Sequence, residues 1–203
     1  MIVNRTLLSF AAWVFGFSAQ ASEITLLVEK GGTAIKIVGT IQKDLFKVEE
    51  LVAEARVRKP ANQITVYMDS QGGNHFEGML IGLFLKRKGI GTAILPGSVC
   101  ESACASIFFG GFNLKTGKPQ RLVYEGGRLG VHRWRRANGR EPTPQERDRV
   151  AGGAGWYLDQ VSVSEAVQAK VSETPPAQIY YLTAQDMAGS AIAVKGSNTA
   201  PKW

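Results

Sequence analysis

Cysteine and histidine are scarce in this chain of 203 residues, which contains two of each. The histidines, His75 and His132, do not stand at a zinc-binding spacing from Cys100 and Cys104, which argues against a metal site. In an oxidising compartment the two cysteines can form a disulfide. Their spacing across an expected helix start predicts Cα atoms near the upper end of the permitted separation.

Long apolar runs are absent after the first residues, and we find neither an internal repeat nor a low-complexity tract. The N-terminus has a charged start, an apolar run over residues 7–17 and the small-x-small sequence Ser18-Ala19-Gln20-Ala21. This layout predicts a secretory signal peptide over residues 1–21, cleaved after Ala21, and a periplasmic or secreted protein. The alternative is an uncleaved anchor, although the apolar run is shorter than a typical membrane span.

The remaining residues, 22–203, have a length and composition that predict one globular domain, with a loose tail over residues 194–203. The net charge of the full chain is +7. Its basic clusters have no interleaved aromatic residues, so we interpret them as solvated helix ends and loop edges, and we do not expect nucleic-acid binding. These clusters are 56–59, 86–88 and 133–140.

Apolar periodicity predicts strands that alternate with helices. We expect a hairpin or two adjacent strands over 23–28 and 33–38, then strands over 64–68, 90–95, 122–124 and 129–132. Helices are expected over 43–57, 76–85, from Ser102 onward, and over 145–171, the last as one helix or two broken at Gly152-Gly153. A polar loop is expected over 113–120, and a short strand and a helix begun by Thr183 over 180–190. The alternation indicates an α/β domain with a mainly parallel sheet.

Ser102 lies between the two cysteines, where small residues follow an apolar strand and begin a helix. Free backbone N–H groups at a helix N-terminus favour developing negative charge, so this position suits a nucleophile. The alternative interpretation is an N-cap serine in a tight turn. Two other expected strand ends carry Gly72-Gly73 and His132, which supply close backbone approach and a base. In α/β sheets, sites collect at such carboxyl ends.

The residues resemble a known family. The segments 66–73 and 78–81 are similar to the strand–SPGG–helix segment of the Clp protease proteolytic subunit. The segments 99–111 and Gly130-Val131-His132 are similar to its serine and histidine segments. The Cys-x-Ser-Ala-Cys-Ala element at 100–105 resembles secreted or periplasmic Clp-protease-like proteins of bacteria. The similarity covers roughly 37–134, and 180–192 faintly. It implies a ClpP/crotonase-like fold of stacked β-α units.

The resemblance implies Ser102 as nucleophile and His132 as general base. It also implies an oxyanion hole formed by the N–H of Ala103 and one N–H from Gly72 or Gly73. Cys100 and Cys104 would clamp the nucleophile turn, or alternatively be redox-active. His75 is expected to be a surface residue at a helix start.

Two positions depart from the family pattern. Gln71 stands where the family has proline. Ile179 stands near the place of the third catalytic acid, and the nearest acids are Glu173 and Asp186. A dyad whose histidine is oriented by a backbone carbonyl or by water is the alternative to a triad.

The predicted function is therefore an extracytoplasmic serine hydrolase, a peptidase that acts on peptides or unfolded protein without a cofactor. Relatives of this fold assemble, so the resemblance implies a homo-oligomer. The alternative is a catalytically silent binding or assembly module of the same fold. Binding of acyl-coenzyme A, as in the crotonase-like relatives, suits a secreted protein poorly.

Overall fold

A computed structural model describes residues 21–29, 32–59, 63–136 and 143–201 of the chain. The expected signal peptide lies outside the described residues except for Ala21, and so do residues 137–140 of the third basic cluster. Within the described ranges, no helix is both long enough and apolar enough to cross a membrane.

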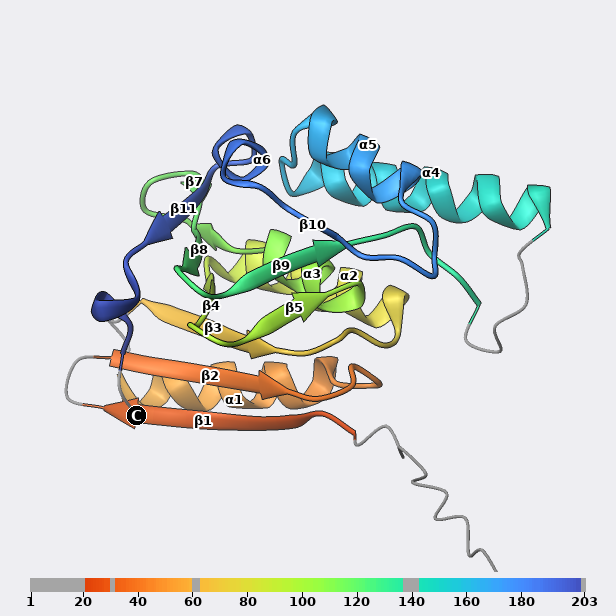
Figure 1. Ribbon diagram of the computed structural model, residues 1–203. Coiled ribbons are helices and arrows are strands. Elements are labelled where there is room, and N and C mark those ends of the chain that lie inside the picture. The colour runs from red at the N-terminus through yellow and green to blue at the C-terminus, as the bar shows by residue number, and fades with distance from the viewer. Residues whose placement is uncertain (1–20, 30–31, 60–62, 137–142, 202–203) are drawn as a thin grey trace, which may run out of the picture.

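The main sheet has six strands in the order β1-β2-β3-β4-β8-β11 (Figure 1). Only the hairpin of β1 and β2 is antiparallel, and every other neighbouring pair is parallel. The α/β architecture with a mainly parallel sheet is therefore confirmed. The strands are β1 (Glu23–Glu29), β2 (Gly32–Val38), β3 (Ile64–Asp69), β4 (Gly91–Ile94), β8 (Arg121–Tyr124) and β11 (Ile192–Lys195).

A second, smaller sheet carries the candidate site. Its strands are β10 (Tyr180–Tyr181), β9 (Arg128–Val131) and β5 (Val99–Glu101), in that order. We did not predict β5 as a separate strand, because three residues are too few for a periodic pattern. The expected loop over 113–120 contains part of a short antiparallel pair, β6 (Phe112–Asn113) with β7 (Lys118–Pro119).

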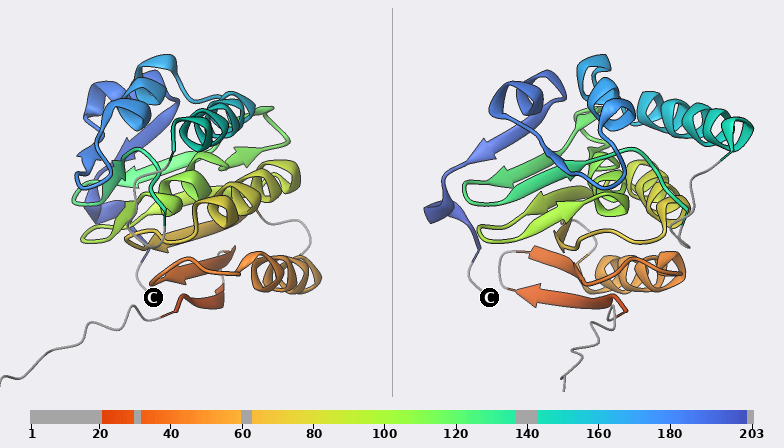
Figure 2. Two further views of the ribbon diagram at one scale, coloured as in Figure 1. Left: turned by 90° about the vertical axis from the view of Figure 1, so that its right-hand side faces the viewer. Right: turned by 45° about the vertical axis from the view of Figure 1, so that its right-hand side comes forward.

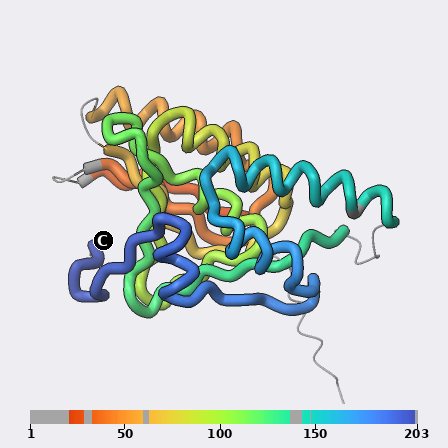
Figure 3. Tube along the Cα trace, turned by 90° about the horizontal axis from the view of Figure 1, so that it is seen from above, coloured from red at the N-terminus to blue at the C-terminus, as the bar shows by residue number. Residues whose placement is uncertain are grey.

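Helices α1, α2 and α4 lie along one side of the strands (Figure 2). Seen from above, the N-terminal half of α4 extends beyond the rest of the molecule (Figure 3). Helix α2 begins after Asn74, whose side chain accepts from the N–H of Glu77, and ends at Gly89 in the left-handed conformation. The helices are α1 (Leu45–Arg58), α2 (His75–Lys88), α3 (Ala103–Phe109), α4 (Pro144–Gln160), α5 (Glu165–Glu173) and α6 (Ala184–Gly189).

The long C-terminal helical segment is broken, but not at the expected place. Helix α4 runs through Gly152 and Gly153, and the break falls at residues 161–164. Glycine alone does not end a helix whose N-terminus is fixed by a capping box, here made by Thr143 and Glu146. At the break Ser162 has a φ of 58° and the Ser164 side chain caps α5.

The C-terminal segment also differs from the expected loose tail. Val194 and Lys195 belong to β11 and pair with β8, and Ser197–Thr199 forms a 3-10 turn. We did not predict β11 because its four residues are too few for a clear strand pattern.

The core lies between the strands and the helices and encloses α3, all seven of whose residues are buried. One charged residue, Arg121, is buried with it at 3% exposure. Its guanidinium donates to the backbone carbonyls of Ser190 at 2.9 Å and Ser162 at 3.4 Å, and also to that of Val161. Arg121 therefore ties β8 to the break between α4 and α5.

Candidate active site

Ser102 occupies the one-residue junction between β5 and α3. Its backbone has φ 57° and ψ −120°, a conformation that residues with a side chain rarely adopt. Such conformations cost about 1–3 kcal/mol and persist where the surrounding structure imposes them. The same sharp strand-to-helix turn exposes the serine of hydrolase nucleophile elbows. Ser102 stands at the N-cap position, but its side chain makes no capping hydrogen bond, so the N-cap interpretation does not account for it.

Contacts from two other segments of the chain impose this turn. The N–H of Ser102 donates to the carbonyl of Gly130 in β9 at 3.1 Å. On the other side, β5 exchanges hydrogen bonds with Ser70, which accepts from the N–H of Glu101 at 2.9 Å and donates to Val99 at 2.7 Å. The backbone around the serine is thus fixed by sequence-distant partners.

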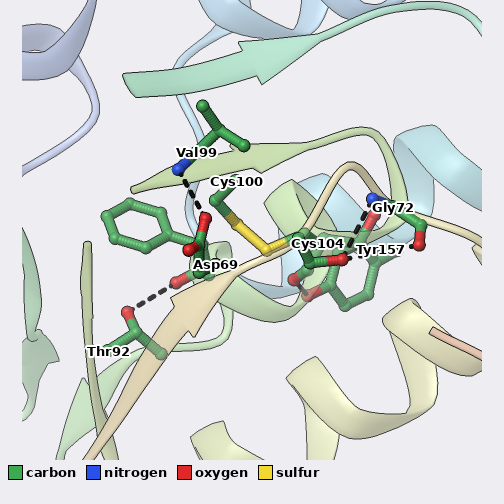
Figure 4. Close-up of a disulfide and its surroundings, with 10 residues drawn as sticks. Asp69, Gly72, Thr92, Val99, Cys100, Cys104 and Tyr157 are labelled. Carbon is green, nitrogen blue, oxygen red and sulfur yellow. Dashed lines mark hydrogen bonds between the residues drawn. A yellow bond between two sulfur atoms is a disulfide. The ribbon is translucent and has the colours of Figure 1, made fainter. Parts of the chain in front are cut away.

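A disulfide joins Cys100 and Cys104 across Ser102 (Figure 4). Both cysteines are completely buried. Their Cα atoms are 5.2 Å apart, which is within the permitted range. We expected a separation near the upper end of that range, and the observed one is shorter. The reason is the positive φ of Ser102, which turns the chain back and brings the two residues together.

The turn after β3 packs directly on this junction. A Cβ atom at Gly72 would lie 2.7 Å from the Cβ of Ser102 and 2.8 Å from the carbonyl oxygen of Glu101. Gly72 and Gly73 have φ values of 102° and 145°. Only glycine therefore fits at position 72, for its conformation as well as for the close approach.

The backbone N–H groups of Gly72, Gly73 and Ala103 differ in whether an acceptor is bonded to them. The N–H of Gly72 donates to the Ser70 side-chain oxygen at 3.0 Å, as the dashed line in Figure 4 shows. Among the residues that the structure describes, no acceptor is bonded to the N–H of Gly73 or of Ala103. Of the two glycines we expected to supply an oxyanion donor, Gly73 is the one with a free group.

Ser102 opens into a cavity of about 1220 Å³. The cavity brings together residues from three segments of the chain: Gly73 and His75, Glu101 and Ser102, and His132. Its apolar wall is formed by side chains of α2, α3 and α4 and of the segment after α5: Met79, Phe109, Tyr157, Leu158 and Ile179. Tyr157 is fixed there because its hydroxyl donates to the carbonyl of Ser106.

His132 follows β9 directly and is half-buried. Burial is the main cause that lowers its pKa, and Arg135 lowers it further, while the carbonyl of Pro176 and the carboxylate of Glu101 raise it. The net effect keeps the imidazole neutral at neutral pH, as a general base requires. No hydrogen bond joins Ser102 and His132 in the described structure, and Nδ1 of His132 is buried without a partner there. Such hydrogen bonds often tighten only with substrate bound.

Neither expected acid lies in the cavity wall with His132. Asp186 caps α6, where its carboxylate accepts from the N–H and hydroxyl of Thr183 at 2.8 Å each and from the hydroxyl of Tyr180 at 3.0 Å. Glu173 is the last residue of α5 and is not among the residues that line the cavity. The polar group of this region that acts on His132 is the backbone carbonyl of Pro176.

Sequence reasoning missed two further groups in the wall. Glu101 lines the cavity next to Ser102, and its carboxylate accepts from the hydroxyl of Tyr181. His75 is partly buried rather than a surface residue, with a buried Nε2 atom. The only sequence signal was proximity, because Glu101 precedes the serine and His75 closely follows Gly73.

The strand order and the site at the carboxyl ends of β3, β5 and β9 define the class as an α/β protein with a mainly parallel sheet. No protein-family model matches the sequence, and no curated protein is significantly similar to it. Among solved structures, ClpP1 from Listeria monocytogenes is similar, with a TM-score of 0.58 and 16% identity over 80% of this chain and 91% of that chain. A mutant of the 1510-N membrane-bound stomatin-specific protease has a TM-score of 0.57 and 16% identity, over 79% of this chain and 76% of that one. These likenesses support the ClpP-like fold that the motifs predicted.

Proposed function

We propose that this protein is a serine hydrolase of the ClpP type that cleaves peptides. The observation that carries the proposal is the position of Ser102. Its side chain is released from capping, held on a strained turn, and placed in one cavity with a neutral histidine and an unpaired backbone N–H group. A structural serine has no need of this combination.

In the proposed reaction the Oγ of Ser102 attacks the carbonyl carbon of the scissile bond, and His132 takes the proton. The carbonyl oxygen becomes an oxyanion, which accepts hydrogen bonds from the N–H groups of Ala103 and Gly73. When the C–N bond breaks, His132 gives the proton to the leaving amine. Water then hydrolyses the acyl-enzyme by the same steps, which restores Ser102.

A fluorophosphonate probe tests this function because it reacts with activated serines. We expect the mature protein to be labelled, the Ser102→Ala variant to be unlabelled, and a His132→Ala variant to be labelled at least ~10²-fold more slowly. Equal and negligible labelling of the native protein and Ser102→Ala would refute the hydrolase. If the native protein also cleaves a peptide, and the probe blocks that cleavage, the protein is a peptidase and not only an esterase.

A catalytically silent assembly module is the second candidate. The absence of a carboxylate partner for His132 among the described residues favours it. The same labelling experiment distinguishes the two functions, since a silent module leaves Ser102 unmodified. The motif resemblance also supports a homo-oligomer, which sedimentation of the mature protein would test.

The extracytoplasmic setting is part of the proposal. It rests on the N-terminal sequence and on the buried disulfide, which persists in oxidising compartments. Fractionation of cells that express the full chain, with the mass of the exported form, would test both export and cleavage after Ala21. The full-length mass in the cytoplasmic fraction alone would contradict it.

A further inference from the structure

His75 is the cavity residue that the proposed reaction leaves without a task. It is the first residue of α2 and follows Gly73 by two positions, so it lies on the same turn as one proposed oxyanion donor. Its imidazole lines the cavity together with Ser102 and His132. The neighbouring cap explains the position of Asn74, but the cap makes no use of the His75 ring.

The Nε2 atom of His75 is buried and has no hydrogen-bond partner among the described residues. Buried polar atoms in native proteins are nearly always paired, because an unpaired one loses its hydration without compensation. Because His75 lines a substrate-sized cavity, the missing partner is one that a bound ligand can supply. Gly72, three residues before His75 in the chain, approaches Ser102 so closely that an added Cβ would lie 2.7 Å from the serine Cβ.

The ring is neutral under ordinary conditions. Burial, with a smaller contribution from His132, lowers the pKa of His75 to about 4. A neutral imidazole with so low a pKa is a weak base, which leaves proton abstraction to His132. In the tautomer that carries its proton on Nε2, the neutral ring is still a hydrogen-bond donor, and neutral donors of this kind stabilise developing oxyanions.

We propose that His75 donates a hydrogen bond from Nε2 to the substrate's scissile carbonyl oxygen, as a third oxyanion donor beside the N–H groups of Gly73 and Ala103. This inference rests on the proposed hydrolase function. No proton is transferred: the Nε2–H bond persists through the reaction, and the hydrogen bond strengthens as charge develops on the oxygen. His75 would thus be a catalytic residue of this site.

Two substitutions separate the donor from the volume it occupies. His75→Phe keeps a ring of similar size and removes the donor, whereas His75→Gln retains an N–H donor. We expect His75→Phe to lower kcat for p-nitrophenyl butyrate by ~10²-fold with KM within about threefold of the native value, and to slow fluorophosphonate labelling similarly. His75→Gln should recover a tenfold or larger part of the loss.

Circular dichroism and thermal unfolding of each variant establish that it is folded. If His75→Phe does not fold, His75→Ala takes its place in the comparison with His75→Gln. A donorless variant that is folded and keeps native kcat overturns this inference alone, as does His75→Gln with no recovery. If the native protein itself shows no labelling that depends on Ser102, both the proposed function and this inference are refuted.

Discussion

Replacement of Gly72 by alanine tests whether the turn after β3 is shaped around the nucleophile. The new Cβ would meet the Cβ of Ser102 at 2.7 Å and the carbonyl oxygen of Glu101 at 2.8 Å, both closer than real Cβ contacts. The backbone at φ 102° is also unfavourable for any residue with a side chain. Both effects act on the folded state.

The two costs can be separated. Positive φ costs about 1–2 kcal/mol for a non-glycine residue, and overpacking of a close-packed site costs about 1–3 kcal/mol. Gly72→Ala should therefore lower the free energy of unfolding by about 2–5 kcal/mol. Gly97 offers a matched control, because its φ is 79° but an added Cβ would meet nothing within 4 Å. Gly97→Ala should carry the backbone cost alone.

Urea unfolding with the disulfide intact measures the stability of both variants, and fluorophosphonate labelling measures the site. We expect Gly72→Ala to be less stable than Gly97→Ala by about 1–3 kcal/mol. It should also be labelled at least ~10-fold more slowly, since the displaced serine no longer faces the oxyanion donors. Equal stability and equal labelling of the two variants would show that the approach of Gly72 to Ser102 does not hold the nucleophile.

Three further predictions concern the supports of the site. Replacing both Cys100 and Cys104 by alanine opens a loop with a sequence separation of 4. This should lower the free energy of unfolding by about 2 kcal/mol, measured against the native protein by urea unfolding. Unchanged unfolding and unchanged labelling would mean that the disulfide does not stabilise the turn at Ser102. Because the pKa of His75 is about 4 in the folded state against an ordinary value of 6.5, the unfolded chain binds the proton first, so stability is complete above pH 6.5 and falls as the pH drops toward 4. In His75→Gln, the decrease in the free energy of unfolding across this pH range should be smaller than in the native protein, by at most about 3 kcal/mol. An identical pH profile of the two proteins would contradict the lowered pKa. Finally, Arg121→Met leaves backbone carbonyls unpaired and should lower the free energy of unfolding by about 2–4 kcal/mol. The control Arg128→Met removes an exposed guanidinium 4.7 Å from the Tyr181 ring and should lower it by less than about 1 kcal/mol. Similar losses for the two variants would show that Arg121 does not tie β8 to the helices.

The strands and helices of the main layer were predictable because each has a periodic pattern and a clear end. The run at 64–68 is apolar and β-branched, and the structure extends it by one residue to Asp69. The helix expected over 76–85 is α2, which runs three residues further to Lys88 and ends at Gly89 in the left-handed conformation that glycine favours. Local chemistry decides these elements, so a single sequence is enough.

The geometry of the site was predictable only in part. The motifs named Ser102, His132, Gly72, Gly73 and Ala103 as candidates, and the structure places Ser102, His132 and Gly73 in one cavity. Which glycine keeps a free N–H depends on the Ser70 side chain, and that contact follows from the three-dimensional turn.

The supporting groups of His132 depend on contacts that no local pattern encodes. The carbonyl of Pro176 acts on a histidine far earlier in the chain. Burial of Nε2 in His75 likewise depends on packing between α2 and other elements, so sequence alone indicated a surface residue.

The conformation of Ser102 is imposed by partners distant in sequence, and this has a consequence for folding. The serine bonds to Gly130, its strand β5 bonds to Ser70, and β5 pairs with β9 from Val99↔Arg128 onward. None of these contacts forms within a short stretch of chain, so each must wait for loops to close. A nascent or partly folded chain therefore contains an ordinary, unreactive serine hydroxyl. Under the proposed function, the reactivity of Ser102 therefore arises only after these loops have closed.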